Sequence, residues 1–342
     1  MEGTMKVNKE ALLEALKHAI LGVGNEGHIE QSSSFIFKGG KVMTYSDEIM
    51  VSTPVEVNVD GIVPASELLA LLNKVEGDEV EIGIEDESLV VKGGRRFKAG
   101  LRLAKELRLP IDEVPLPEKW TKMPENLIEA MKLCLLSVSA DFTKPAFACL
   151  HFIENRIESC DNYRLSRYIV KGDFPSSILL PAKAVKAVID ISPKEYSVTE
   201  GWMHFKTEDG TVLSSRLVEG TYPDLSALVG MKEPAKIVFP EEMEKMLERV
   251  KILAEVDIMG SSYAMVKIQD GELSIKGEGQ TGWAEESREV DWKGDPLLFQ
   301  INSKFLAEIS KHHTVAEVDK DKTRLKFTGD NFIHVIALME KE

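Results

Sequence analysis

Leu180-Pro181-Ala182-Lys183 is the stretch that decides the fold, because it has a counterpart on either side of it in the chain. Val63-Pro64-Ala65-Ser66 lies 117 positions earlier, and Ile301-Asn302-Ser303-Lys304 lies 121 positions later. All three follow a strand-like apolar run and precede a helical pattern. A repeat of this length exceeds that of a solenoid and is about the size of a domain.

A second marker repeats earlier in each unit, at Asn8, Pro124 and Pro240, which are 116 positions apart. Asn is a good N-cap residue, and Pro is tolerated in the first turn of a helix, so each marker predicts a helix start. Pro-marked linkers follow at Leu109–Pro117 and Tyr222–Pro234. Together the markers predict three tandem similar domains, residues 1–117, 118–233 and 234–342.

We expect each unit to contain two helices and seven or eight mostly antiparallel strands, with the helices covering one face of the sheets. This arrangement is an α+β fold class. The helices are expected at Lys9–Leu21, Glu67–Lys74, Glu125–Val138, Lys183–Ile191, Glu241–Leu253 and Lys304–Lys311.

Composition favours a soluble protein of the cytoplasm. The chain has 342 residues, is 43% hydrophobic and contains no apolar run long enough to span a membrane. Its net charge of −15 argues against a nucleic-acid partner only weakly, because charges farther than about 8 Å from a bound duplex are screened. Cys134, Cys149 and Cys160 have no metal-ligand spacing, so we expect reduced, buried cysteines and no metal site.

The second unit carries motifs that resemble those of bacterial sliding clamps, the beta subunit of DNA polymerase III. Residues Ser159–Leu165 look like the Thr-Asp-Gly-His-Arg-Leu segment of that family, with Asn162-Tyr163 in place of Gly-His. Ser214–Asp224 resembles its Ser-x-Leu-(Ile/Val)-(Asp/Glu)-Gly-x-(Phe/Tyr)-Pro-Asp run, and Lys144–Phe147 its Arg-Pro-x-Leu stretch. The resemblance covers all three units in order, which suggests a divergent or phage-encoded member.

The resemblance implies a non-enzymatic DNA polymerase processivity factor without cofactor. Members close head to tail as a homodimer, so that this chain would be half of a six-domain ring around double-stranded DNA. The implied partners are DNA, DNA polymerase, a clamp loader and a second copy of the chain, with no membrane. The implied location is the bacterial cytoplasm, or the host cytoplasm if the chain is phage-encoded.

Basic residues on the two helices of each unit are the implied DNA contacts, which would position the protein on phosphates without specifying bases. They are Lys9, Lys17, Lys74, Lys132, Lys183, Lys186, Lys245, Arg249, Lys251, Lys304 and Lys311. The alternative is a solvated helix surface, because the same helices carry glutamates.

Two protein interfaces are implied as well. A partner-peptide cleft between the second and third domains would be lined by Phe147, Cys160, Asn162, Tyr163, Arg164, Leu165, Pro223, Leu228, Val335 and Met339. The dimer interface would join a basic edge to an acidic and apolar one, formed by Arg95, Arg96, Phe97, Ile252, Leu253, Glu285, Glu286 and Glu289.

No catalytic constellation can be assembled from the sequence. His312 and His313 are adjacent and cannot share a helix face as metal ligands do, and no phosphate-binding glycine loop occurs. Two alternatives stay open: a clamp-like replication or repair scaffold that does not encircle DNA, and an enzyme built from repeated α+β domains. Mass in solution separates the first from a ring, and activity on small substrates would favour the second.

Overall fold

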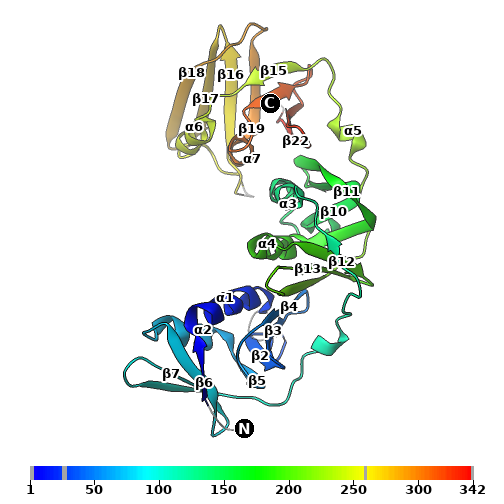
Figure 1. Ribbon diagram of the computed structural model, residues 1–342. Helices are drawn as coiled ribbons and strands as arrows, with labels where there is room; N and C mark the ends of the chain where they lie inside the picture. The colour runs from blue at the N-terminus through cyan, green and yellow to red at the C-terminus, as the bar shows by residue number, and fades with distance from the viewer. Residues whose placement is uncertain (1–3, 25–28, 258–259, 340–342) are drawn as a thin grey trace. The chain divides into compact units, whose positions relative to one another are not determined.

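The computed structural model of the protein describes residues 4–24, 29–257 and 260–339. It consists of two compact units (Figure 1). Unit 1 comprises Met1–Met123 and Leu180–Val218, and unit 2 comprises Pro124–Leu179 and Glu219–Glu342. The division between the units therefore runs through the second predicted domain, and the three-domain division stays a prediction.

Helices form at all six predicted places. The described residues contain α1 (Lys9–Ala19), α2 (Ala65–Lys74), α3 (Leu127–Cys134), α4 (Ala182–Ile191), the unpredicted short α5 (Ser226–Val229), α6 (Met243–Val250) and α7 (Ser303–Ser310). The predicted ends of the first, third and fifth helices were too late. The 3-10 turns η1 (Ile20–Gly22) and η3 (Leu135–Ser137) follow the first and third, and α6 ends at Val250, before a turn. Two further 3-10 turns are η2 (Ile111–Glu113) and η4 (Pro145–Ala148).

The markers act as helix starts in two ways. The Asn8 side chain accepts a hydrogen bond from the Ala11 amide at 2.9 Å, which is N-capping. Pro124 lies three residues before α3 and accepts from the Leu127 amide at 3.0 Å, and Pro240 relates to α6 in the same way. The prediction that the prolines lie inside the first helical turn was therefore wrong: they form the turn that leads into the helix.

Unit 1 contains two antiparallel sheets. The larger has the order β5 (Gly61–Pro64), β2 (Ser34–Lys38), β3 (Lys41–Tyr45), β4 (Ile49–Pro54), β14 (Val212–Arg216), β13 (Trp202–Lys206), β12 (Glu195–Thr199), β9 (Thr121–Lys122). The smaller has the order β1 (Thr4–Asn8), β6 (Glu79–Glu85), β7 (Ser88–Gly93), β8 (Phe97–Arg102). Pairing of β4 with β14, in a register that sets Val51 opposite Leu213, joins strands far apart in the sequence.

Unit 2 also contains two antiparallel sheets. The larger has the order β10 (Cys149–Cys160), β11 (Arg164–Pro181), β22 (Phe332–Ala337), β21 (Arg324–Thr328), β20 (Val315–Val318), β15 (Ala235–Val238). The smaller has the order β18 (Gly282–Glu289), β17 (Glu272–Gly279), β16 (Tyr263–Gln269), β19 (Leu297–Asn302). Here β11 pairs with β22, and Ser166 lies opposite His334.

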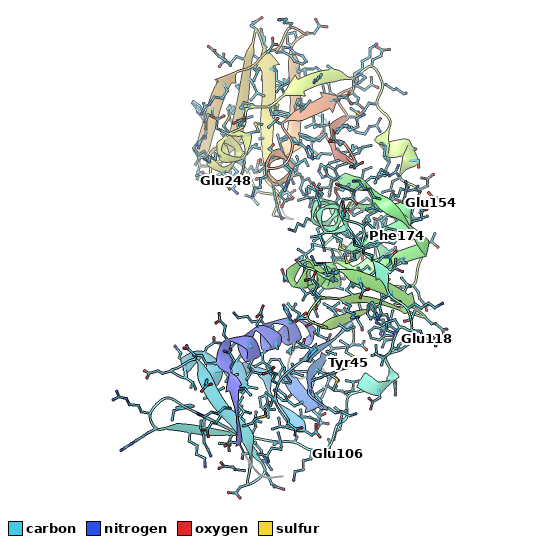
Figure 2. The ribbon with its side chains drawn as sticks, in the orientation of Figure 1. Tyr45, Glu106, Glu118, Glu154, Phe174 and Glu248 are labelled. Carbon is cyan, nitrogen blue, oxygen red and sulfur yellow. The ribbon has the colours of Figure 1, made fainter. Side chains whose placement is uncertain are left out.

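The helices are held by apolar cores against the sheets. In unit 1, Leu16 of α1 and Leu68 of α2 share one buried cluster with Phe35 of β2 and Leu89 of β7. Four labelled glutamates lie at the surface in Figure 2, Glu106, Glu118, Glu154 and Glu248, whereas Tyr45 and Phe174 are buried. The helices therefore bury one side against the sheets and leave the other side facing solvent, and the predicted DNA contacts lie on the solvent side.

Candidate nucleic-acid and partner interfaces

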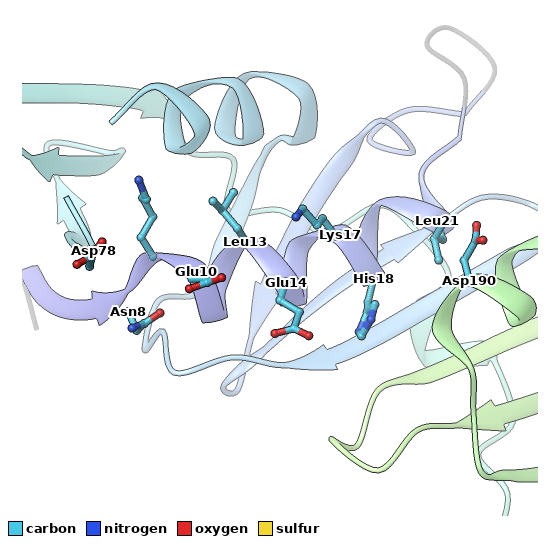
Figure 3. A pocket seen from close by; sticks show the side chains of 10 residues that line it. Asn8, Glu10, Leu13, Glu14, Lys17, His18, Leu21, Asp78 and Asp190 are labelled. Carbon is cyan, nitrogen blue, oxygen red and sulfur yellow. The ribbon is translucent and has the colours of Figure 1, made fainter. Parts of the chain in front are cut away.

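The solvent-facing side of α1 is hollowed and acidic. A cavity of about 790 Å³ is lined by Glu10, Glu14, Asp78 and Asp190, with Lys17 among the few cations (Figure 3). Lys9 also lines this cavity, but its Nζ donates to the carbonyl of Val75 at the end of α2, at 2.8 Å. The amine of Lys9 is therefore used within the fold, where it complements the C-terminus of α2.

Four more of the predicted DNA contacts already have carboxylate partners. Arg249 binds Glu286 through two hydrogen bonds of 2.6 and 2.7 Å, which raises the pKa of the guanidinium and lowers that of the carboxyl. The other three pairs are Lys183–Glu48 at 3.4 Å, Lys304–Glu308 at 3.9 Å and Lys311–Glu244 at 2.9 Å. These cations would have to exchange a protein partner for a phosphate.

The remaining six are exposed lysines that make no ion pair with any described residue. They are divided equally, with Lys17, Lys74 and Lys186 in unit 1, and Lys132, Lys245 and Lys251 in unit 2. A lysine of this kind can contact phosphate as a flexible point charge, without directional demands.

The predicted peptide cleft separates into buried and exposed residues. Cys160, Leu165 and Val335 lie in the core, and burial raises the pKa of the Cys160 thiol. The backbone amide of Cys160 donates to the hydroxyl of Tyr222 at 2.7 Å, and the Tyr222 ring lies 5.8 Å from that of Phe147. These buried members support the surface from below.

Arg164 is also largely enclosed, since its side chain is only 9% exposed. Its guanidinium binds Asp161 at 3.1 Å and Glu308 at 2.6 Å, and it lies 3.9 Å from the centre of the Phe305 ring. An arginine paired twice and stacked on an aromatic ring is well fixed. Arg164 thus ties β11 to α7.

The exposed members are Asn162, Tyr163, Pro223, Leu228 and Met339, while Phe147 is half-buried. The ring of Tyr163 lies 6.4 Å from that of Phe305. Arg324 donates to the carbonyl of Leu228 at 3.0 Å and so fixes α5 on β21. An apolar surface with few polar groups suits the anchor of a peptide.

The predicted dimer residues lie on two edge strands. Arg95 and Arg96 form the turn before β8, and Phe97, 39% exposed, begins that strand. Glu285 and Glu289 are exposed on β18, whereas Glu286 points to the helix side and binds Arg249. The structure describes one hydrogen-bonded neighbour for each strand, β7 for β8 and β17 for β18.

The apolar part of the predicted dimer surface lies beside β18. Ile252, just after α6, is 74% exposed, and Leu253 is half-buried close to Gly282 at the start of the strand. The second unit thus presents apolar and acidic groups along one edge.

Three residues near these surfaces were missed by the sequence reasoning. Tyr222 stood inside a motif of the second unit, but its buried hydroxyl bond could not be foreseen. Phe305, beneath Arg164, follows the N-cap Asn302 without any distinguishing signal. Trp283 lies on the β18 edge, where it is 60% exposed.

The described residues contain no group of three or more His, Cys, Asp or Glu side chains that could hold a metal ion. All three cysteines are buried, as predicted. His312 and His313 follow α7 and bond to its last turn through their amides, and burial lowers the pKa of His313. Among the described helices, none is long and apolar enough to cross a membrane.

Solved structures resemble this chain over its whole length. The sliding clamp of Bartonella birtlesii has a TM-score of 0.84 and 16% identity, covering 100% of both chains. The DNA polymerase III beta chain of Streptococcus pneumoniae has a TM-score of 0.84 and 16% identity, covering 98% of this chain and 99% of its own. The beta subunit of Pseudomonas aeruginosa has a TM-score of 0.80 and 16% identity, covering 99% and 100%. No protein-family model matches the sequence. The predicted α+β class is confirmed: from end to end, this chain has the fold of the bacterial DNA polymerase III beta subunit, the sliding clamp.

Proposed function

We propose that this protein is a DNA polymerase processivity factor, a sliding clamp with no catalytic activity of its own. Two copies, each of three domains (residues 1–117, 118–233 and 234–342), close head to tail around duplex DNA. The ring holds a polymerase through the cleft that includes Tyr163, Leu228 and Met339, and a loader opens it. The full-length clamp fold supports this function.

The observation that carries the proposal is the order of the strand pairs between repeats. In the first repeat, the strand after the first hairpin (β4) pairs with β14, the last strand of the second repeat. In the second repeat, the corresponding part of β11 pairs with β22, the last strand of the third. In both cases a strand of one repeat pairs with the last strand of the next repeat. Applied to the third repeat, this rule pairs β18 with β8, the last strand of the first repeat, of another copy of the chain. Such a head-to-tail contact makes a ring where the rotation closes.

An apolar residue after the first helix of each repeat supports the same closure. Leu21, Leu136 and Ile252 occupy corresponding places, each two residues after the end of α1, α3 or α6. Leu21 and Leu136 are half-buried, whereas Ile252 is 74% exposed. We propose that Phe97 from β8 of a second copy covers Ile252. Burying such side chains contributes about 25 cal/mol per Å².

The mass in solution tests closure. The wild-type chain of 38.1 kDa should sediment as a particle of two chains. Phe97→Ala should yield monomers, because exposed ion pairs alone give only about 0.2–1 kcal/mol each. Phe142→Ala, which removes a phenylalanine 82% exposed elsewhere, is the matched control and should stay dimeric. A wild-type chain that is monomeric at every concentration would favour the scaffold alternative.

DNA contact is proposed for the six unpaired lysines rather than for all eleven basic residues. Because the same helices carry acids, static affinity for DNA should be weak, which a ring tolerates. Replacing all six by alanine should flatten the salt dependence of binding by about 0.9 in log–log slope for each phosphate that is no longer neutralised. Replacing the paired Lys183, Arg249, Lys304 and Lys311 should change it far less. An equal effect of both sets would refute this assignment.

Partner binding is proposed for the exposed members of the cleft. Tyr163→Ala and Leu228→Ala should each weaken a polymerase-derived peptide by about tenfold or more, as hot-spot residues do. Asn162-Tyr163 replaces the Gly-His of the resembling motif, so peptides of a host's own replication proteins should bind poorly. Tight binding of such a host peptide, unaffected by Tyr163→Ala, would contradict this.

A further inference from the structure

Trp283 is unusual for its position, because a large aromatic side chain on an edge strand is 60% exposed. It lies on the side of β18 away from α6, together with Glu285 and Glu289, whereas Glu286 faces α6 and binds Arg249. Lys276 of the neighbouring strand lies 5.7 Å from the centre of the Trp283 ring. The Trp283 ring thus already has one lysine of its own chain beside it.

The internal repeat determines which residue of β8 corresponds to which residue of β14 and β22. Three equivalent backbone hydrogen bonds are donated by the residue directly after the first strand of each repeat (β1, β9 and β15): Lys9 to Asp78, Met123 to Lys194 and Phe239 to Thr314. The residue three positions after each acceptor begins a row of directly opposed residues on three neighbouring strands. The rows are Glu81–Lys92–Lys98, Ser197–His204–Ser214 and Glu317–Lys326–Val335. Lys98 therefore corresponds to Ser214 and Val335.

The strands that pair with these last strands, β4, β11 and β18, can be matched to one another in the same way. Val51 lies against Gly22, and Ser166 hydrogen-bonds Ser137 at 2.8 Å, where Gly22 and Ser137 end the 3-10 turns η1 and η3. Thr44, the cross-strand partner of Val51, donates to the carbonyl of Ala19, the last residue of α1. In the third repeat Gly277, the cross-strand partner of Ala284, lies against the carbonyl of Val250, the last residue of α6. Ala284 thus corresponds to Val51 and Ser166.

These correspondences specify a register. Val51 pairs with Leu213 and Ser166 with His334, which are the neighbours of Ser214 and Val335. The equivalent pair is Ala284 with Phe97. In an antiparallel pair, Lys98 then lies opposite Trp283, and Arg96 opposite Glu285. Phe97 falls on the helix side, the side of the exposed Ile252.

Resting on the proposed ring, we propose that Trp283 is the aromatic anchor of closure and that it receives Lys98 of a second copy, so that its ring lies between two lysines. Lys98 is exposed and held on the outer side of its sheet by Glu85. Arg96 opposite Glu285 adds a complementary charge pair. A cation over a tryptophan face is the strongest form of this interaction, and tryptophan is the residue most enriched at interface hot spots.

The dimer dissociation constant of the full-length chain tests this role. Trp283→Ala should raise it about tenfold or more, and Lys98→Ala about threefold to tenfold. Trp120→Ala is the matched control, because a lysine, Lys206, also lies over that ring, and Trp120 belongs to neither β8 nor β18. It should leave the dimer unchanged.

Cysteine cross-linking tests the register independently of affinity. Arg96→Cys with Glu285→Cys should form a disulfide between copies, since directly opposed residues lie within disulfide reach. Arg96→Cys with Ser287→Cys, shifted by two residues, should not, because that separation is too long. The native cysteines are buried and should not compete.

The outcomes separate this inference from the ring itself. A dimer that Trp283→Ala leaves intact, or that cross-links only through the shifted pair, overturns the inference and leaves the ring standing. A wild-type chain that is monomeric at all concentrations overturns both. Weakening by Trp283→Ala together with the Arg96–Glu285 cross-link supports both.

Discussion

The two strand junctions inside this chain share one backbone plan. We call β4–β14 the first junction and β11–β22 the second. Before β4, the Ile49 amide donates to the Ser46 side chain at 3.1 Å, and before β11 the Arg164 amide donates to the Asp161 side chain at 2.8 Å. The same turn therefore leads into both junctions, whichever side chains they carry.

The outer faces of the two junctions differ in chemistry. The first is apolar: Met43 and Met50 pack with Ile111 and Val114 of the linker, around a cavity of about 430 Å³. The second is charged: the buried Glu158 binds His151 at 3.2 Å and Arg167 at 2.9 Å. Backbone pairing thus preserves the architecture while the side chains are free to change, which allows only 16% identity with clamps of the same fold.

The largest expected effect comes from breaking the charged face. Glu158→Ala leaves Arg167 without its carboxylate partner and leaves Arg156 with Glu154 alone, and it should lower the free energy of unfolding by about 3–5 kcal/mol. Met43→Ala, at the corresponding place in the first junction, should cost about 2 kcal/mol. Urea denaturation of both variants measures the difference. Equal costs would show that the two faces are energetically alike.

A smaller effect is expected at the tyrosine of the second linker. Tyr222→Phe leaves the buried amide of Cys160 without its acceptor and should cost about 1–3 kcal/mol. Tyr45→Phe in the first junction is the control, since the Tyr45 hydroxyl makes no hydrogen bond to the described residues. Its unfolding midpoint should stay near that of the wild type; a larger loss there than for Tyr222→Phe would refute the role of the bond.

Acid should weaken the second junction through His334, whose pKa falls to about 3 because of burial and the charge of Arg164. In the unfolded chain His334 binds a proton below about pH 6.5, whereas in the folded chain it stays neutral down to about pH 3. Stability is therefore lost as the pH falls from about 6.5 towards 3, by up to about 1.4 kcal/mol per pH unit.

His334→Leu mimics Leu213 of the first junction and should remove this part of the slope. His204 in unit 1, with a pKa of about 4, should maintain a residual slope. Unfolding free energies measured across this pH range test the prediction, and an unchanged slope in His334→Leu would contradict it.

The smallest effect is expected where the first junction is bridged at the surface. Lys183 pairs with Glu48 at 3.4 Å, and both side chains are more than half exposed. Lys183→Ala should change the free energy of unfolding by less than about 1 kcal/mol. A loss of unfolding free energy as large as that of Glu158→Ala would contradict this prediction, because an ion pair exposed to water contributes little to stability.

The sequence predicted the fold far better than the sites. The repeated markers and helical periodicity located all six long helices, because capping residues and apolar spacing act locally. The burial of Arg164 and the pairing of Arg249 with Glu286 could not be predicted, because they depend on α7 and β18, which lie far along the chain. Likewise, nothing local distinguished Trp283 on an edge from a tryptophan in a core.

Topological retention on DNA tests the central claim most directly. The protein is threaded onto a linear duplex anchored at one end, the free end is blocked with a bulky protein, and the sample is washed in high salt. A ring should remain through the wash and be released when a restriction enzyme cuts the duplex. Release in the wash despite blocked ends, or retention after cutting, would contradict encirclement.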